Sequence, residues 1–191
     1  MKQRPFVFLI CSGAFALAGC GKTSRVAVSD ACALLSHADI EAVQGSPIVD
    51  HKSSSQPDPN FQISQCYYTA KESNRSVSLS VTTANSGGTD GRSVKDLWEA
   101  TFARNEQGEK AERDEPREKR AGARESEEEK TPPRRIDGVG TEAYWLGSPI
   151  GGALQVLHKG ASLRLSLGGP DSTDAKIEKS KTLALKALSH L

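Results

Sequence analysis

Residues 153–167 read ALQVLHKGASLRLSL and carry the strongest β-strand pattern of this 191-residue chain. Apolar side chains alternate with other residues on both sides of a short break, at Leu154, Val156, Leu163, Leu165 and Leu167. The break at residues 159–161 contains a glycine and suits a hairpin turn. Because a period of two residues places one set of side chains on one face of a strand, this stretch predicts two antiparallel strands with one buried face.

The same alternation recurs upstream and indicates a larger sheet. Residues 62–70 and 76–83 are expected to form a hairpin around residues 73–75, and residues 142–146 are expected to form another strand. Together with the two strands above, these segments predict about five strands. Residues 46–60 contain a run of serines and two prolines, so we expect a loop there.

Helices are predicted wherever a polar capping residue precedes apolar residues at helical spacing. They are expected over residues 31–35 after Ser29 or Asp30, over residues 37–44 after Ser36, after Ser93, and from Asp171 or Ser172 to the C-terminus. Asp39 stands three residues after Ser36, which is the spacing of a capping box, and Gly45 can end that helix. The elements together predict an α+β fold, a two-layer sandwich in which three or four helices pack on one side of an antiparallel sheet.

Residues 105–135 differ in composition from the rest of the chain. Their 31 residues contain 10 acidic and 9 basic side chains, and alanine is the one apolar side chain among them. Such a segment buries too little apolar surface to offset the entropy of ordering it. We therefore expect a disordered charged insertion within a single domain made of residues 30–104 and 136–191.

The first residues of the chain indicate export. Lys2 and Arg4 precede an apolar stretch over residues 6–18, and small residues follow it. A basic start, a short apolar segment and a small-residue cleavage site are typical of a secretory signal peptide, which we assign to residues 1–19. The net charge of +1 over the whole chain argues against a nucleic-acid-binding protein, and no nucleic-acid partner is expected.

The end of this leader is more specific. Residues 17–20 read Leu-Ala-Gly-Cys and resemble the lipobox of bacterial lipoproteins. The resemblance implies cleavage before Cys20, a diacylglycerol on its sulfur and an acyl chain such as palmitate on its amine. Several acyl chains anchor a protein far more firmly than one. Residues 20–29 would then be a lipidated tether, and Gly21 at the second mature position favours the outer membrane, facing the periplasm.

The four cysteines are accounted for by this processing. Cys11 would leave with the leader and Cys20 would carry lipid, so Cys32 and Cys66 remain. In an oxidising compartment they are expected to form a disulfide. A redox pair or a metal site is the alternative; neither a Cys-x-x-Cys motif nor a histidine at ligand spacing supports it, so we expect no metal and no cofactor.

Three stretches carry a second resemblance. They are residues 30–36, residues 66–68 and residues 138–145, which read GVGTEAYW. These motifs, with the last helix, resemble uncharacterised bacterial lipoproteins that contain a small cysteine-paired domain of unknown function. The resemblance implies a fold like the Mog1/PsbP two-layer sandwich, and it implies no particular activity.

Catalytic motifs are missing from the sequence. The four histidines are far apart along the chain, no Gly-x-Ser-x-Gly elbow occurs, and no catalytic residue is assigned. Two hypotheses remain. The first is a non-catalytic lipid-anchored envelope protein that binds a partner protein or a small ligand through the sheet's open face or the strand with Tyr144 and Trp145. The second is an envelope hydrolase whose site is assembled from residues distant in sequence.

Overall fold

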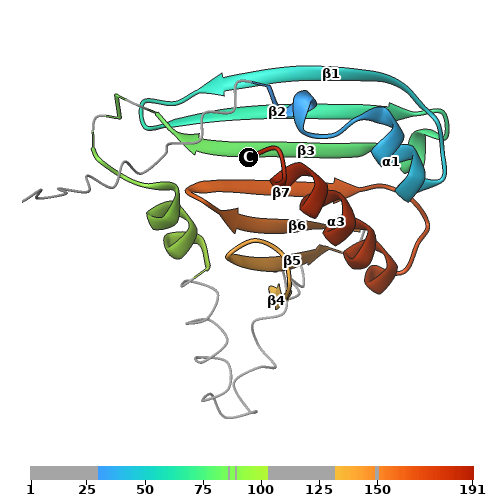
Figure 1. Ribbon diagram of the computed structural model, residues 1–191. Helices are drawn as coiled ribbons and strands as arrows, with labels where there is room; N and C mark the ends of the chain where they lie inside the picture. Colours follow the sequence, from blue (N-terminus) through green and yellow to red (C-terminus); the bar gives the residue numbers. More distant parts are fainter. Residues whose placement is uncertain (1–29, 86, 89, 103–131, 149–150) are drawn as a thin grey trace, which may run out of the picture.

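The computed structural model describes residues 30–85, 87–88, 90–102, 132–148 and 151–191, and these form one antiparallel sheet with helices on it (Figure 1). The strands are β1 (Ile48–Pro57), β2 (Phe61–Ala70), β3 (Val77–Ala84), β4 (Arg134–Arg135), β5 (Glu142–Ser148), β6 (Gly151–His158) and β7 (Ala161–Leu167). The helices are η1 (Ala31–Leu34), α1 (His37–Gln44), η2 (Ser73–Arg75), α3 (Thr173–Leu188) and a segment over residues 94–102.

The strand order is β1-β2-β3-β7-β6-β5-β4. Strands β1 to β3 form one meander and β4 to β7 form another, and the two meet where β3 pairs with β7. Strands β6 and β7 form the hairpin predicted from residues 153–167, with His158 opposite Ala161. β7 then pairs with β3, where Leu165 lies opposite Leu79. Both residues are fully buried, because β3 and β7 lie in the middle of the sheet and carry apolar side chains on the same face.

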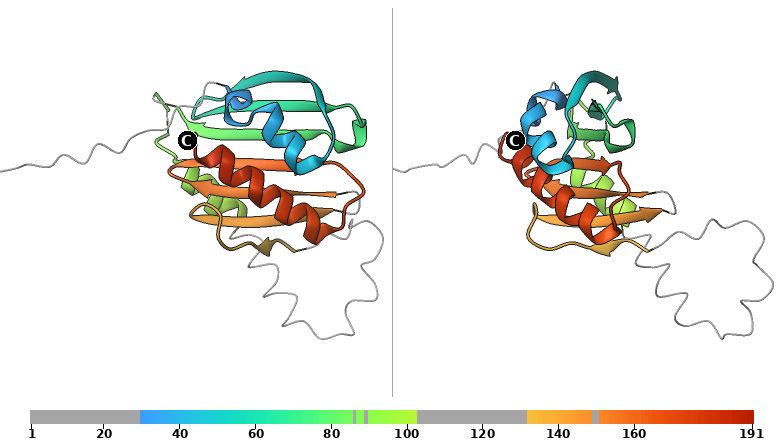
Figure 2. Two further views of the ribbon diagram at one scale, coloured as in Figure 1. Left: turned by 45° about the vertical axis from the view of Figure 1, so that its right-hand side comes forward. Right: turned by 90° about the vertical axis from the view of Figure 1, so that its right-hand side faces the viewer.

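One face of the sheet carries the main core. Figure 2 shows α1 and α3 lying on the same side of the sheet, α1 toward the β1 edge and α3 across β7 and β6. The apolar side of α3 packs there through Ile177, Leu183, Ala184 and Leu188. Segment 94–102 lies on the opposite side (Figure 2), so the prediction that the helices share one side of the sheet is wrong. Among the described residues, none of the helices combines the length and the apolar character needed to cross a bilayer.

The helix ends follow the capping residues of the sequence. Ser36 and Asp39 form a complete capping box at the start of α1, and Gly45 ends that helix in the left-handed conformation. The Asp30 side chain caps η1, and the Ser172 hydroxyl accepts a hydrogen bond from the third residue of α3. These predicted capping positions are therefore confirmed.

The α+β class and the antiparallel sheet are confirmed, but the predicted count of about five strands is wrong. The sheet has seven strands in the described residues. Segment 46–60, expected to be a loop, contains β1, a polar edge strand exposed along nearly all of its length. The two-residue strand β4 lies at the end of segment 105–135 and pairs with β5. Both strands lack apolar alternation, because edge strands contribute few side chains to the core.

Candidate functional site: the open sheet face

The side of the sheet away from α1 and α3 is polar. We call it the open face and define it by nine side chains that share this side through their cross-strand pairing: Lys52, Ser54, Gln65, Tyr67, Ser78, Ser80, Gln155, Arg164 and Ser166. Among the described helices, only segment 94–102 lies on this side, and it covers the end of the sheet near β5. Antiparallel sheets commonly leave one face to solvent, and here that face is rich in hydroxyl and amide groups.

Five of these side chains form one continuous row across the strands. Their order from β6 to β1 is Gln155, Arg164, Ser80, Gln65 and Ser54. At the usual strand spacing the row is about 19 Å long. Its members are hydrogen-bond donors and acceptors, with Arg164 as the one formal charge. The row can therefore bind an extended polar ligand or segment by repeated hydrogen bonds.

Tyr67 gives the open face its exposed aromatic ring. It lies beside Lys52 and Ser78 in the next row, and 49% of its surface is exposed. An exposed tyrosine combines apolar contact area with a polar tip, which makes it a common anchor in binding surfaces. The sequence carries no signal for this role, because Tyr67 and the buried Tyr68 look equivalent until the packed side of the strand is known.

The two aromatic residues predicted as a partner surface are both buried. Tyr144 is 8% exposed and packs under segment 94–102, whereas Trp145 is 3% exposed and lies in the main core. They point to opposite faces because successive side chains of a strand alternate. Neither ring contributes to the exposed surface, so the exposed aromatic group of this sheet is Tyr67 instead.

The predicted cysteine pair lies at the edge of the main core. Cys32 and Cys66 form a disulfide with a Cα–Cα distance of 5.0 Å and a sequence separation of 34 residues. The bond joins η1 to β2 and so attaches the start of the described chain to the sheet. The predicted lipidation site, Cys20, the signal peptide and most of segment 105–135 lie outside the described residues.

Two histidines that the sequence separates by 14 positions lie in contact. His37 Nε2 and His51 Nδ1 are 2.9 Å apart, which is a hydrogen-bond distance. Both rings pack against the ring of Tyr68, whose hydroxyl donates to the backbone oxygens of Leu35 and Cys32. Burial raises the pKa of Tyr68 to about 12, and the Asp30 carboxylate adds to that shift.

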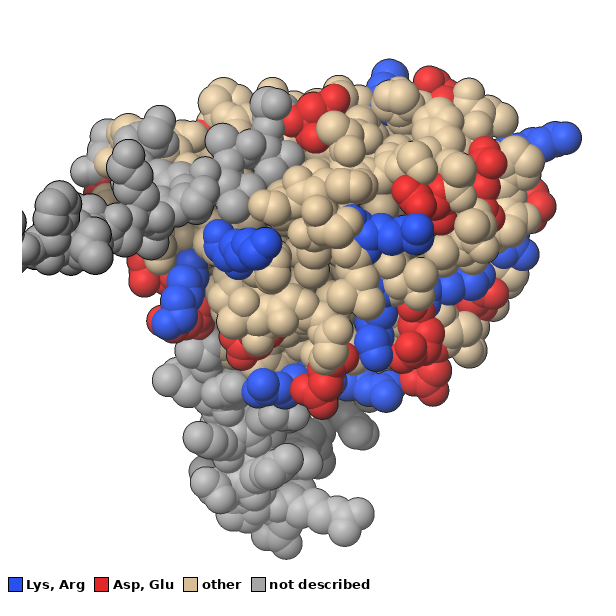
Figure 3. Space-filling model, viewed as in Figure 1, with Lys and Arg blue, Asp and Glu red and all other residues tan. Residues whose placement is uncertain are grey.

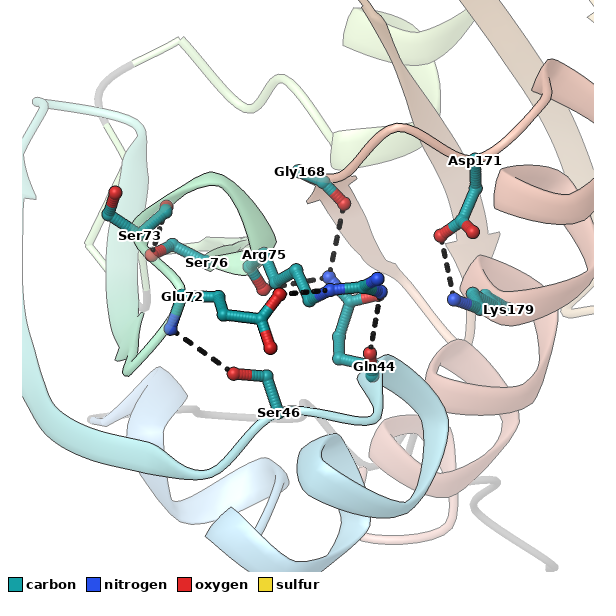
Figure 4. A network of polar contacts seen from close by, with 9 residues as sticks. All are labelled: Gln44, Ser46, Glu72, Ser73, Arg75, Ser76, Gly168, Asp171 and Lys179. Atoms are coloured by element: carbon teal, nitrogen blue, oxygen red, sulfur yellow. Dashed lines mark hydrogen bonds and ion pairs between the residues drawn. The ribbon is translucent and has the colours of Figure 1, made fainter.

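A polar network at the C-terminal end of α1 joins this end to the turn before β3 and to the segment after β7 (Figure 4). Gln44 Nε2 donates to the backbone oxygens of Arg75 and Gly168, and the Arg75 guanidinium donates back to Gln44 O at 3.0 Å. Arg75 also pairs with Glu72, and Lys179 pairs with Asp171 nearby. These groups neutralise one another, so the network has a structural role rather than a binding role.

Charge on the α1/α3 face is mixed. Figure 3 shows lysines and arginines interspersed with aspartates and glutamates over this face, without a large area of one sign. Over the described ranges, no three histidine, cysteine, aspartate or glutamate residues come together as a metal-binding group. Comparison of the chain with known protein families, with curated proteins and with solved structures found no match.

Proposed function

We infer that this chain is a lipid-anchored binding protein of a bacterial cell envelope that holds a partner on its open face without catalysing a reaction. The observation that carries the proposal is the separation of the two faces: α1 and α3 cover one side of the sheet, and the other presents polar side chains with an exposed tyrosine. Exposed hydroxyl and amide groups beside an aromatic ring are the kind of surface that binds a partner protein.

The anchor in this proposal is the acylated Cys20. The leader pattern of the sequence supports it, and the disulfide agrees with maturation in an oxidising compartment. Nine residues, 21–29, separate Cys20 from Asp30, where the described chain begins. The Cys20→Ser variant should either leave the membrane fraction or keep its uncleaved leader. In both cases its electrophoretic mobility should change, because it lacks the acyl chains. A variant that stays in the membrane fraction with unchanged mobility would contradict the anchor.

The binding surface is tested by site-specific photo-crosslinking in intact envelopes. A photoreactive residue replaces Tyr67 on the open face, and the control replaces Leu185, which is 50% exposed on α3. We expect a discrete crosslinked product from position 67 and not from position 185. Absence of products at position 67, or the same products at both positions, contradicts the proposed surface. Hydrolysis of ester or peptidoglycan substrates well above the blank would contradict the non-catalytic assignment.

A further inference from the structure

We propose that His37 and His51 form a binding site for a divalent transition-metal ion that prefers tetragonal coordination, with Cu²⁺ as the preferred ion. Neither residue belongs to the open face. His37 is the first residue of α1, and His51 lies on β1. Their facing ring nitrogens, Nε2 and Nδ1, are the groups that would bind the ion.

The two nitrogens are already close enough for one ion to bind both of them. Imidazole nitrogens bind such ions at about 2.0–2.1 Å, so two ligands at right angles are about 2.9 Å apart and two tetrahedral ligands about 3.3 Å apart. The observed separation is 2.9 Å. A right angle between neighbouring ligands is typical of Cu²⁺ and Ni²⁺ with nitrogen and oxygen ligands, and Cu²⁺ binds such sites most strongly of the divalent first-row ions.

The two rings are held in place by the fold. Tyr68 packs against both, with ring centroids 6.3 Å from His37 and 6.1 Å from His51. Its own hydroxyl is fixed by the backbone of residues 32–35, which the disulfide attaches to the sheet. His51 lies directly opposite Tyr68 in the β1–β2 pair. Supported ligands lose little conformational entropy on binding, which favours the ion.

The charges around the pair favour a cation. The Asp30 carboxylate accepts the hydroxyl of Ser53 at 2.9 Å, and Ser53 lies on the same face of β1 as His51. Without metal, the N–H of one ring donates a hydrogen bond to the facing nitrogen of the other ring. A bound ion takes one lone pair from each of these two nitrogens, each neutral ring carries its proton on its other nitrogen, and water fills the remaining positions. The site is thus open on one side and exchangeable, unlike a closed structural site.

The test adds Cu²⁺ to the purified exported chain and measures binding by calorimetry and by electron paramagnetic resonance. We expect one ion per chain and hyperfine coupling to two imidazole nitrogens. His37→Ala and His51→Ala should each weaken binding by at least about tenfold. His158→Ala removes a partly buried imidazole from β6 and serves as the matched control, with binding unchanged.

A second measurement removes dependence on the variants' folding. In the unmodified chain, the ring resonances of His37 and His51 should broaden together at low Cu²⁺, before those of His158 and His190. No binding, coupling to one imidazole, or broadening of only one ring of the pair would overturn the proposal. Binding retained in either folded alanine variant would overturn it equally.

Discussion

Trp98 Nε1 donates a 2.8 Å hydrogen bond to Glu142 Oε2, and this bond joins segment 94–102 to β5. The other oxygen of the same carboxylate accepts the Tyr144 hydroxyl at 3.0 Å. Trp98 and Tyr144 also lie in one aromatic cluster with Phe102. One partly buried carboxylate therefore fixes the position of this helical segment over the end of the open face.

Replacing Trp98 by phenylalanine should lower the free energy of unfolding by about 2–3 kcal/mol, because the change removes a hydrogen bond to a charged group and part of a buried ring. Leu97→Ala is the control, since Leu97 lies on the same helical segment and is 39% exposed; its effect should stay within about 0.5–1 kcal/mol. Urea denaturation measures both. Equal losses in the two variants would show that the bond to Glu142 does not stabilise the fold.

The ion pair between Asp39 and Lys186 should make stability depend on pH. Lys186 Nζ lies 2.7 Å from Asp39 Oδ1, joining α3 to α1. The hydrogen bond from Lys186, followed by that from Ser36, lowers the pKa of Asp39 from 3.8 to about 2. Because the folded pKa is the lower one, this stabilisation is complete above about pH 4 and is lost as the pH falls toward 2.

Lys186→Met should therefore lower the free energy of unfolding by about 0.5–1 kcal/mol at pH 7, since the lysine is partly exposed and solvent screens the pair. The slope of unfolding free energy between pH 2 and pH 4 should become shallower in this variant (the range follows from the two pKa values). Lys181→Met breaks a pair within α3 and is the control. The same acid slope in wild type and Lys186→Met would refute the assignment.

Removal of the disulfide should destabilise the domain. Cys32 and Cys66 are separated by 34 residues, and a closed loop of that length is worth about 3–4 kcal/mol in the chain-entropy model. The Cys32→Ala, Cys66→Ala double variant should show this loss in denaturant titrations. A reductant should destabilise the wild type by a similar amount and leave the double variant unchanged. If the fully reduced wild type were as stable as the oxidised wild type, this prediction would be contradicted.

Two glycines of the turn before β5 provide a matched pair. Gly138 and Gly140 both have a positive φ, of 82° and 64°. A Cβ at Gly138 would meet open space, whereas a Cβ at Gly140 would overlap Val156 Cγ1 and the backbone oxygen of Leu157. Gly138→Ala should cost about 1 kcal/mol from backbone strain, and Gly140→Ala at least about 1 kcal/mol more from the overlap. Thermal denaturation of both variants measures the difference, and equal losses would contradict the steric argument.

Local patterns predicted the parts of the fold that depend on neighbours in the chain. The sequence predicts Ser36 as a helix cap, Asp171 or Ser172 as another, and residues 76–83 as a strand, because capping and alternation need only a few adjacent residues. The polar strand β1 was missed, since its backbone pairs with β2 while its side chains contribute little to the core. Strand formation there depends on the available edge of β2, which has no local sequence signal.

Exposure of the candidate surface residues likewise depends on the tertiary structure and not on the local pattern. Tyr67 and Tyr68 are adjacent in the sequence, yet one is exposed on the open face and the other is buried. A strand pattern says that they point in opposite directions, but only the side on which α1 and α3 pack decides which of them is exposed. The same argument explains why Tyr144 and Trp145 are both buried: the main core covers one face of β5 and segment 94–102 covers the other.

By itself, the sequence determined the α+β class and the positions of several helix ends, because these depend on composition and on short spacings. Only the tertiary structure decided that β3 pairs with β7 and that His37 meets His51. Those contacts depend on strand register and on the packing of α1 beside β1, which are set by burial of the whole core rather than by residues near either site.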